Sequence, residues 1–270
     1  MTSAIGNMRM AVGLTTMAVA TLLLLPIQLF ALRTGWIRDG RVPRLWHRLA
    51  ARVLGLRVRT HGRIAERRPL LIAANHVSWS DIVVLGSIAE VHFVAKSEMA
   101  GWPILGTFAR LQRSVFVERE MRRKSGDQAR ELSARLANGD PMVLFAEGTT
   151  GPGSGVMPFK STLFGAAQMA LQNLPGDSVL VQPVAIAYTR LYGLPMSGRE
   201  RAEIAWIGDT PLVPHLKSLF ARRAMDVEVY FGEPVLFASG NDRKAVTREV
   251  ESSVRTMLAK ALRDPPVAGR

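Results

Sequence analysis

The sequence predicts an α/β domain with a mostly parallel or mixed sheet flanked by helices. From about residue 56 onward, short β-branched and aliphatic runs alternate with segments of helical periodicity, a pattern typical of such sheets. A chain of 270 residues can build one large domain with a proper core. Ahead of this pattern, an uncharged apolar stretch predicts a membrane-anchoring helix, and an arginine-rich stretch predicts a basic amphipathic helix.

The individual elements follow from local patterns along the chain. Strands are expected at Leu56–Thr60, Leu70–Ala74, His92–Ala95, Ser114–Val117, Met142–Phe145, Val179–Ala187, Ala202–Ile207 and Asp226–Phe231. Helices are expected at Ser80–Ala89, Pro103–Ala109, Asp127–Ala137, Ser161–Gln172, Pro211–Ala221 and Asp242–Leu262. In the last helix Asp242 is a capping residue, and an i,i+4 stripe predicts the buried face at Val246, Val250, Val254, Leu258 and Leu262.

These elements divide the chain into three parts. Residues 1–40 are the expected anchor, and residues 41–264 form the folded domain, of which 41–55 are the basic amphipathic helix. Residues 265–270 are expected to be a disordered tail, since they follow the last helix and begin with two prolines.

The expected anchor contains 23 consecutive uncharged residues, Met10 to Leu32. As a helix this stretch would be about 34 Å long, enough to cross a hydrocarbon core of about 30 Å. Pro26 would kink it, so a re-entrant helix in one leaflet is an open alternative. A cleavable signal peptide and a buried core helix are the other interpretations. No small-x-small cleavage site follows the stretch, which disfavours the signal peptide.

Most of the positive charge follows the anchor directly. Residues 33–68 hold eleven arginines and two acids, which accounts for +9 of the formal net charge of +13. The positive-inside rule then places the domain on the cytoplasmic side of the inner membrane. From residue 41 to residue 56, arginines at helical spacing (Arg41, Arg44, Arg48, Arg52) lie beside apolar positions (Leu45, Trp46, Leu49, Val53, Leu56), which favours an anionic membrane surface as partner. A solvated helix packed on the domain is the alternative, and no motif indicates nucleic acid.

Composition also limits the chemistry. The chain has no cysteine, which excludes disulfides, thiolate nucleophiles and cysteine-ligated metals. Its five histidines are scattered without ligand spacing, so no metal and no cofactor are expected.

One group of reactive residues follows the expected strand at 70–74. Asn75 and His76 end that strand, and Asp81 comes five residues after His76. If the chain turns there, Asp81 can accept the Nδ1 proton of His76 and leave Nε2 free as a base. The chain has no Gly-x-Ser-x-Gly nucleophile elbow, so direct transfer to a substrate hydroxyl fits better than a covalent intermediate. A histidine simply capped by a nearby aspartate is the alternative.

A second group follows the strand at 142–145. Glu147, Gly148, Thr149 and Thr150 begin a glycine-rich loop that extends to Lys160. Glycines let the backbone approach a ligand closely, and the side chains offer polar contacts. A mobile surface loop without a ligand is the alternative interpretation.

Together, the Asn75-His76 and Asp81 group and the Phe145-x-Glu147-Gly148-Thr149 group resemble the lysophospholipid acyltransferase family. Two further blocks match it in order, at 114–119 (SVFVER, ending in Arg119) and 181–186 (VQPVAI). The resemblance implies that His76 and Asp81 are catalytic in direct acyl transfer from a thioester of acyl carrier protein or coenzyme A to a lysolipid. It also implies that Asn75, Arg119, the Glu147–Thr150 segment and Lys160 bind substrate. Amides near the start of the helix after Asp81 are expected to hold the oxyanion.

One position departs from the usual pattern of this family. The phosphate-acceptor members have arginine after Glu-Gly-Thr, whereas this chain has Thr150. Threonine cannot replace a bidentate phosphate donor. The extended block FAEGTT with PFKS following at 158–161 looks closer to the branch that acylates lyso-ornithine lipid. The alternatives are 1-acylglycerol-3-phosphate as acceptor, a thioesterase, and a non-catalytic lipid-binding protein.

Overall fold

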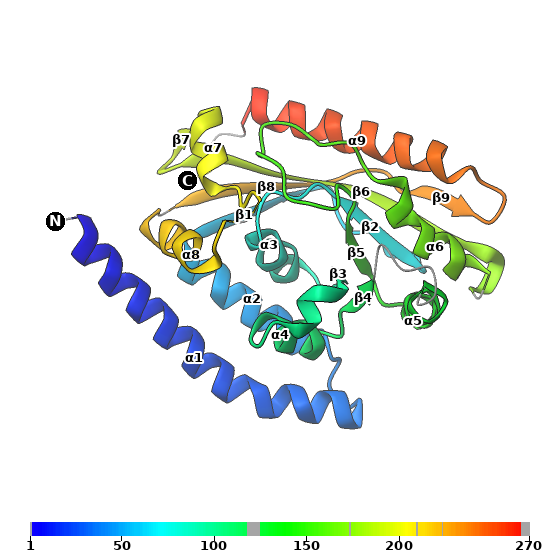
Figure 1. Cartoon of the computed structure of the whole chain (residues 1–270), viewed down its shortest axis with the longest axis horizontal. Helices are drawn as coiled ribbons and strands as arrows, with labels where there is room; N and C mark the ends of the chain where they lie inside the picture. The colour runs from blue at the N-terminus through cyan, green and yellow to red at the C-terminus, as the bar shows by residue number, and fades with distance from the viewer. Residues whose placement is uncertain (1, 118–124, 173, 209, 223, 266–270) are drawn as a thin grey trace.

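The structure is a computed structural model of the whole chain, and it describes all residues except 1, 118–124, 173, 209, 223 and 266–270 (Figure 1). The described strands form one mixed sheet in the order β1-β8-β6-β2-β5-β3-β4, and β7 and β9 also pair with β6. The strands are β1 (Leu56–His61), β2 (Leu70–Ala74), β3 (His92–Lys96), β4 (Val115–Val117), β5 (Met142–Phe145), β6 (Ser178–Leu191), β7 (Leu194–Pro195), β8 (Met225–Phe231) and β9 (Val235–Ala238).

The part of the sheet from β6 to β4 is parallel. Strand β2 lies between β5 and β6 and runs parallel to both, whereas β6 and β8 are antiparallel. Both faces of β2 are buried: Leu70, Ile72 and Ala74 belong to one apolar cluster, and Leu71 and Ala73 belong to the other. This burial explains why β2 is continuously apolar instead of alternating.

Helices cover both faces of the sheet, in the α/β arrangement that the sequence predicts (Figure 1). One face packs against α2 (Arg41–Leu54), α3 (Ser80–Ile88), α7 (Gly198–Ile204) and α8 (Leu212–Ala221). The other packs against α5 (Ser125–Ala137), α6 (Phe164–Leu171) and α9 (Arg243–Arg263). The domain also contains helix α4 (Leu105–Leu111) and the short helices η1 (Ser97–Gly101), η2 (Ser161–Leu163) and η3 (Pro175–Asp177).

Helix α9 confirms its expected cap and most of its expected stripe. The side chain of Asp242 accepts a hydrogen bond from the Lys244 amide, and the stripe is buried from Val246 to Leu258. The last buried position is Ala261, one residue before the expected Leu262.

The strand expected at Ala202–Ile207 is wrong, because its first half ends helix α7 and its second half, after Ile204, is in no strand. A capping box begins the helix: the Ser197 side chain accepts from the Glu200 amide, and the Glu200 side chain accepts from the Ser197 amide. The Ser-x-x-Glu signal for this helix start is present in the sequence at 197–200. Strands β7 and β9 were not expected, and both are short partners of β6.

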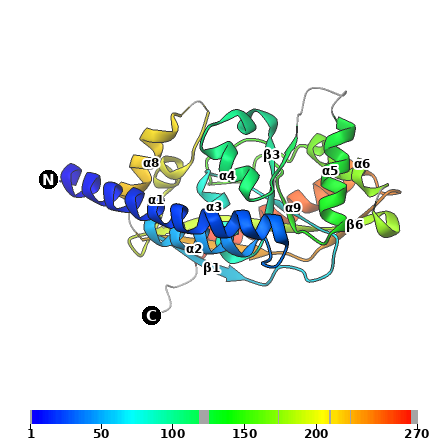
Figure 2. The same cartoon turned by 90° about the horizontal axis from the view of Figure 1, so that it is seen from below.

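Helix α1 (Thr2–Thr34) lies along the domain for most of its length, and its N-terminal turns project beyond it (Figure 2). Near its beginning, Arg9 donates to the Phe220 carbonyl at 3.4 Å. At its middle, the Trp46 indole donates to Thr21 Oγ1 at 2.9 Å. Near its end, Gln28 Nε2 donates to the Leu111 carbonyl at 2.7 Å. The helix is long and apolar enough to cross a membrane, and only 6% of its most apolar window is buried.

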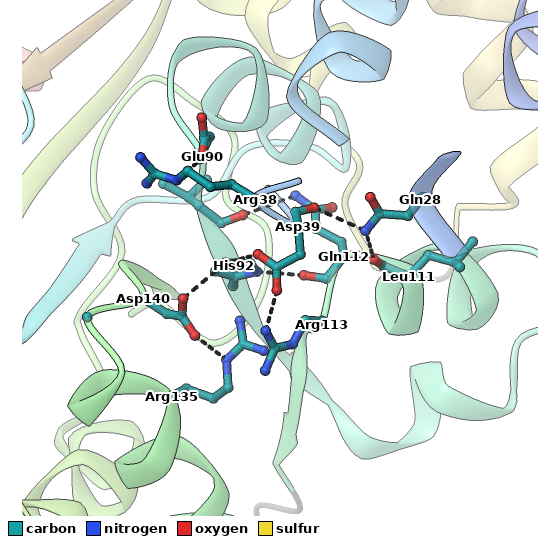
Figure 3. Close-up of polar contacts among 12 residues, drawn as sticks. Gln28, Arg38, Asp39, Glu90, His92, Leu111, Gln112, Arg113, Arg135 and Asp140 are labelled. Atoms are coloured by element: carbon teal, nitrogen blue, oxygen red, sulfur yellow. Dashed lines mark hydrogen bonds and ion pairs between the residues drawn. The ribbon is translucent and has the colours of Figure 1, made fainter. Parts of the chain in front are cut away.

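A cluster of charged and polar side chains fixes the segment after α1 to the domain (Figure 3). Asp39 forms an ion pair with Arg113, and its carboxylate lies 3.9 Å from Nε2 of the buried His92. On the far side of His92, Asp140 lies 3.7 Å from the same nitrogen and pairs with Arg135 at 2.8 Å. The cluster therefore joins the α1–α2 connection to the residues at the beginning of β3, β4 and β5.

Helix α2 spans nearly all of the residues predicted for the basic amphipathic helix. Its apolar positions were expected to face a membrane surface, but Trp46 and Val53 pack against the apolar core of the domain, whereas Leu45 stays exposed. The buried residues of α2 are Val42, His47, Ala50, Ala51 and Leu54. Two sides of the helix are covered because α2 is packed between α1 and α3. Arg41, Arg48 and Arg52 are exposed.

Candidate active site

The two reactive groups of the sequence meet where β2 and β5 end side by side. These strands are parallel, with Ala74 paired to Phe145, so the residues that follow them emerge at the same edge of the sheet. The amide of Ala146 donates to the Ala74 carbonyl at 3.0 Å, which continues the pairing beyond the strands. Such an edge is where α/β proteins place their sites.

The side chains of His76 and Asp81 form the expected dyad. His76 Nδ1 lies 2.8 Å from Asp81 Oδ2. The same carboxylate oxygen accepts the amides of Val77 at 2.6 Å and Ser78 at 3.0 Å. Asp81 lies in the first turn of α3 and is fully buried, so it both closes the loop and orients the imidazole. We assign the Nδ1 proton to this bond because an ionised carboxylate can only accept.

The ring of His76 is held on its face by an aromatic side chain. Phe145, the last residue of β5, stacks on the imidazole with 3.9 Å between ring centroids and 13° between planes. The side chain of His76 is 17% exposed. Within the described part of the chain, the side-chain hydrogen bond of His76 is made by Nδ1 and none is made by Nε2. This nitrogen is therefore available as a base.

Glu147 lies beneath the glycine-rich loop. Its side chain is 1% exposed and accepts backbone hydrogen bonds from Met157 and His76. Burial raises the pKa of the Glu147 carboxyl to about 8, with the negative charge of Asp81 acting in the same direction. The carboxyl thus holds the loop against the main chain of the dyad. Its predicted contact with the acceptor stays a prediction.

The glycine-rich loop folds back over the dyad. The Gly151 amide donates to the His76 carbonyl at 2.7 Å, and the Lys160 amide donates to the Ala146 carbonyl at 2.8 Å. Gly148 has a φ of 74°, a left-handed conformation that favours glycine. Thr150 Oγ1 donates to the Trp206 carbonyl, and the Trp206 amide donates to Val77 at 2.9 Å. Residues from three parts of the chain therefore meet at the site.

The remaining predicted site residues are placed differently. Asn75 is buried, and its amide bridges to β6 by donating to the Ile186 carbonyl at 3.0 Å and accepting from the Ile186 amide at 2.7 Å. It therefore supports the end of β2. Thr149 and the side chain of Lys160 are exposed on the loop. Arg119 lies outside the described residues.

The amides expected to hold the oxyanion are engaged within α3. The Asp81 amide donates to the Ser78 carbonyl at 2.9 Å, and the Ile82 amide donates to the Trp79 carbonyl at 3.2 Å. These bonds form because the helix begins directly at Ser80. The first turn of α3 thus offers no donor at these two positions.

Sequence reasoning missed two contributors to the site. Trp206 reaches the loop from the segment after α7, and Tyr188 on β6 donates to Asp81 Oδ1 at 2.8 Å. Tyr188 follows the matched block at 181–186 by two residues, so the even spacing along β6 was the available signal.

Comparisons with known proteins agree with this geometry. The family described as "Acyltransferase" matches residues 55–187. The chain is 49% identical over 260 residues to a lyso-ornithine lipid O-acyltransferase of Brucella abortus (strain 2308), covering 96% of this chain and 97% of that protein. The chain belongs to the acyltransferase family. The resemblance stated from its motifs is confirmed.

Two further comparisons place this acyltransferase among its relatives. It is 32% identical over 213 residues to a 1-acyl-sn-glycerol-3-phosphate acyltransferase of Neisseria gonorrhoeae, covering 78% of this chain and 77% of that protein. The crystal structure of the 1-acyl-sn-glycerophosphate acyltransferase PlsC from Thermotoga maritima matches with a TM-score of 0.64 at 22% identity, covering all of both chains. The latter likeness confirms the fold. The acyltransferase is therefore more similar to the lyso-ornithine lipid enzyme than to the phosphate-acceptor enzyme.

Proposed function

We propose that this acyltransferase transfers a fatty acyl group from an acyl thioester to the free hydroxyl of lyso-ornithine lipid. The main support is the geometry of the dyad: Asp81 orients His76 through Nδ1, which leaves Nε2 to act as a base. In the transfer, Nε2 takes the proton of the acceptor hydroxyl while its oxygen attacks the thioester carbonyl. The tetrahedral intermediate then collapses, the C–S bond breaks, and the thiolate leaves with the proton from His76.

The acceptor follows from the relatives and from Thr150. The relative at 49% identity is a lyso-ornithine lipid enzyme, while the phosphate-acceptor relative is 32% identical. Thr150 uses its hydroxyl on the Trp206 carbonyl, so it supplies no cation for a phosphate. An amino-acid head group needs no such guanidinium.

An acceptor panel tests this assignment. The purified full chain is given an acyl thioester with lyso-ornithine lipid or with 1-acylglycerol-3-phosphate, and we expect at least a tenfold higher kcat/KM for the former. A preference for the phosphate acceptor would overturn the assignment. Free fatty acid released at the same rate with or without acceptor would instead identify a thioesterase.

The variant Thr150→Arg refines the panel. It should raise the relative rate with 1-acylglycerol-3-phosphate, because arginine supplies a bidentate phosphate donor. The matched control is Thr149→Arg, which adds the same charge at the exposed neighbouring position. Equal gains in both variants would show a general charge effect and contradict the role of position 150.

We propose acyl carrier protein or coenzyme A as the thioester carrier. Both are anionic, and the net charge of +13 favours their approach. Turnover with each loaded carrier, measured at low and high salt, tests the proposal. It predicts that the rate falls with salt, and a rate independent of salt would contradict steering by charge.

We also propose that α1 lies within one leaflet of the inner membrane, with the domain on the cytoplasmic side. The contacts at Arg9 and Gln28 are 19 residues apart in sequence, about 29 Å along a helix. A helix fixed to the domain over that length would draw the domain into the bilayer if it crossed the hydrocarbon core. The exposed side of α1 is apolar, with Leu22 71% exposed.

Residues that follow α1 fit an interfacial position. Trp36 is 85% exposed and packs edge-on against Phe30 with 6.1 Å between ring centroids. Tryptophan is enriched where membrane meets water, and exposed arginines on α2 suit anionic head groups. These features support the re-entrant alternative over a spanning anchor.

Single-cysteine labelling tests the orientation, since the chain has no cysteine of its own. Asn7→Cys and Trp36→Cys introduce thiols near the two ends of α1. A membrane-impermeant maleimide should label both from the cytoplasmic side only. Labelling of Asn7→Cys from the opposite side would show that α1 spans the membrane. Deleting residues 1–40 should release much of the protein from the membrane fraction.

A further inference from the structure

The second carboxylate oxygen of Asp81 has its own hydrogen-bond partner, deep in the sheet. Tyr188 lies on β6 and is fully buried. Its hydroxyl is 2.8 Å from Asp81 Oδ1 and 2.7 Å from the hydroxyl of Ser80. Consecutive hydrogen bonds therefore link Ser80 to Tyr188 and Tyr188 to Asp81, which belongs to the dyad.

The direction of these hydrogen bonds follows from the chemistry of the groups. An ionised carboxylate only accepts, so the Tyr188 hydroxyl donates to Asp81. Its single proton is then used, and Ser80 must donate to the Tyr188 oxygen. Burial raises the pKa of the Tyr188 phenol well above its usual value, which keeps the donor proton in place at physiological pH.

Asp81 depends on such donors because its carboxylate is fully buried. Among the described residues, no lysine or arginine forms an ion pair with Asp81. Oxygen Oδ2 accepts from His76, Val77 and Ser78. In the described part of the chain, Tyr188 is the donor to Oδ1. A buried carboxylate that loses a donor is left with an unsatisfied oxygen, which costs more than an ordinary hydrogen bond contributes.

We propose that Tyr188 is a positioning residue for acyl transfer, because it holds Oδ1 of Asp81 so that Oδ2 stays directed at His76. This proposal rests on the proposed function and deepens it. It assigns β6 a role at the site: the strand supports the dyad through Ile186, which binds Asn75, and through Tyr188, which binds Asp81. Tyr188 acts through Asp81 and does not contact the substrate.

The variant Tyr188→Phe removes the hydroxyl and keeps the ring. Its matched control is Thr189→Val, which removes a buried hydroxyl from the next residue of β6, where Thr189 Oγ1 bonds the Asp226 carbonyl. We expect Tyr188→Phe to lower kcat about 10- to 100-fold with the KM for the lysolipid within twofold, and Thr189→Val to change neither more than twofold. Unchanged kcat in Tyr188→Phe, or an equal loss in Thr189→Val, would overturn the proposal.

A double variant tests whether Tyr188 acts through Asp81. When Tyr188→Phe is added to Asp81→Asn, the residual rate should fall less than twofold further, because the carboxylate that Tyr188 holds is already absent. The same 10- to 100-fold loss in both backgrounds would show that Tyr188 acts independently of Asp81 and would overturn the proposal.

A spectroscopic readout needs no substrate. The Nδ1 proton of His76, bonded to Asp81, should give an NMR resonance that moves in Tyr188→Phe and stays in place in Thr189→Val. An unmoved resonance in Tyr188→Phe would contradict the proposal. A wild-type enzyme that transfers no acyl group would overturn the proposed function instead, and the NMR comparison would still decide the role of Tyr188.

Discussion

The imidazole of His76 lies flat on the phenyl ring of Phe145, with 3.9 Å between the ring centroids. Phe145 ends β5, and His76 follows β2, so the stack joins the ends of two neighbouring parallel strands. A phenyl ring supports the imidazole without competing for its protons. The base is thereby fixed in orientation by Asp81 at one edge and by Phe145 on one face.

Replacing Phe145 with leucine should lower kcat about tenfold, because a rigid flat support becomes a flexible one and the imidazole loses its fixed orientation. The same substitution at Phe237, a buried phenylalanine on β9, controls for lost core volume. Steady-state kinetics and thermal unfolding of the two variants distinguish a loss of imidazole orientation from a general loss of packing. Equal losses of kcat would attribute the effect to packing alone.

Removing the base or its partner should nearly abolish transfer. General base catalysis contributes about 10²- to 10⁴-fold, so His76→Ala should lose at least 100-fold in kcat. Asp81→Asn should lose a comparable factor, since an asparagine amide donor facing Nδ1 favours the wrong tautomer. Circular dichroism checks that both variants fold. Turnover at the wild-type rate in His76→Ala would exclude the dyad from catalysis.

Glu147 should give the stability of the protein a distinct pH dependence. Its pKa is about 8 in the folded protein, against a usual value of 4.5. Between these values the folded chain keeps a proton that the unfolded chain has lost, so the contribution of Glu147 is full below pH 4.5 and is lost as pH rises toward 8. The free energy of unfolding of Glu147→Gln, relative to that of the wild type, should therefore rise by about 1–2 kcal/mol between pH 6 and pH 8. Denaturant unfolding at the two pH values measures this difference.

Two comparisons test whether the pH dependence arises from the Glu147 carboxyl. Glu249→Gln, at an exposed position on α9, should leave the pH dependence of the wild type unchanged. Glu147→Gln should keep kcat within about threefold at pH 7, since the native carboxyl is mostly neutral there. A large loss of activity in Glu147→Gln would show that an ionised carboxylate is required.

The cluster around His92 should contribute measurably to stability (Figure 3). Asp39→Ala removes the partner of Arg113 and one carboxylate beside His92. We expect the free energy of unfolding to fall by about 1–2 kcal/mol, because partly buried donors lose a charged acceptor. Asp127→Ala breaks an exposed pair with Arg130 and should cost less than about 0.5 kcal/mol. Equal losses of stability in the two variants would mean that burial of the cluster does not strengthen its ion pairs.

The sequence predicted the buried elements of the fold best. Strands β2 and β5 have the predicted bounds, because a continuous apolar run of four or five residues is typical of a strand that is buried on both faces. The error at Ala202–Ile207 arose because a short apolar run is compatible with both the helical and the strand periodicity. The two-residue strand β7 and the edge strand β9 depend on pairing with β6, which local patterns do not reveal.

The site was predictable where its geometry is local. Asp81 reaches His76 across five residues, so the spacing alone suggested the contact. The task of Asn75 was not predictable in this way, since its partner Ile186 is 111 residues away. The burial of Glu147 depends on a loop that folds back through Gly151, and the position of Thr150 depends on Trp206. Contacts of this range require the folded topology.

The central place of β6 has a consequence for how the protein is made. Strand β2 needs β6 along one edge, yet β6 begins more than 100 residues later in the chain. During synthesis, His76 and Asp81 leave the ribosome well before Ile186 and Tyr188 do. Until then β2 has an unpaired edge, and the dyad lacks the hydrogen bonds that Ile186 and Tyr188 provide. The nascent chain, with its apolar N-terminal helix already emerged, should therefore remain inactive until the ribosome has passed β6.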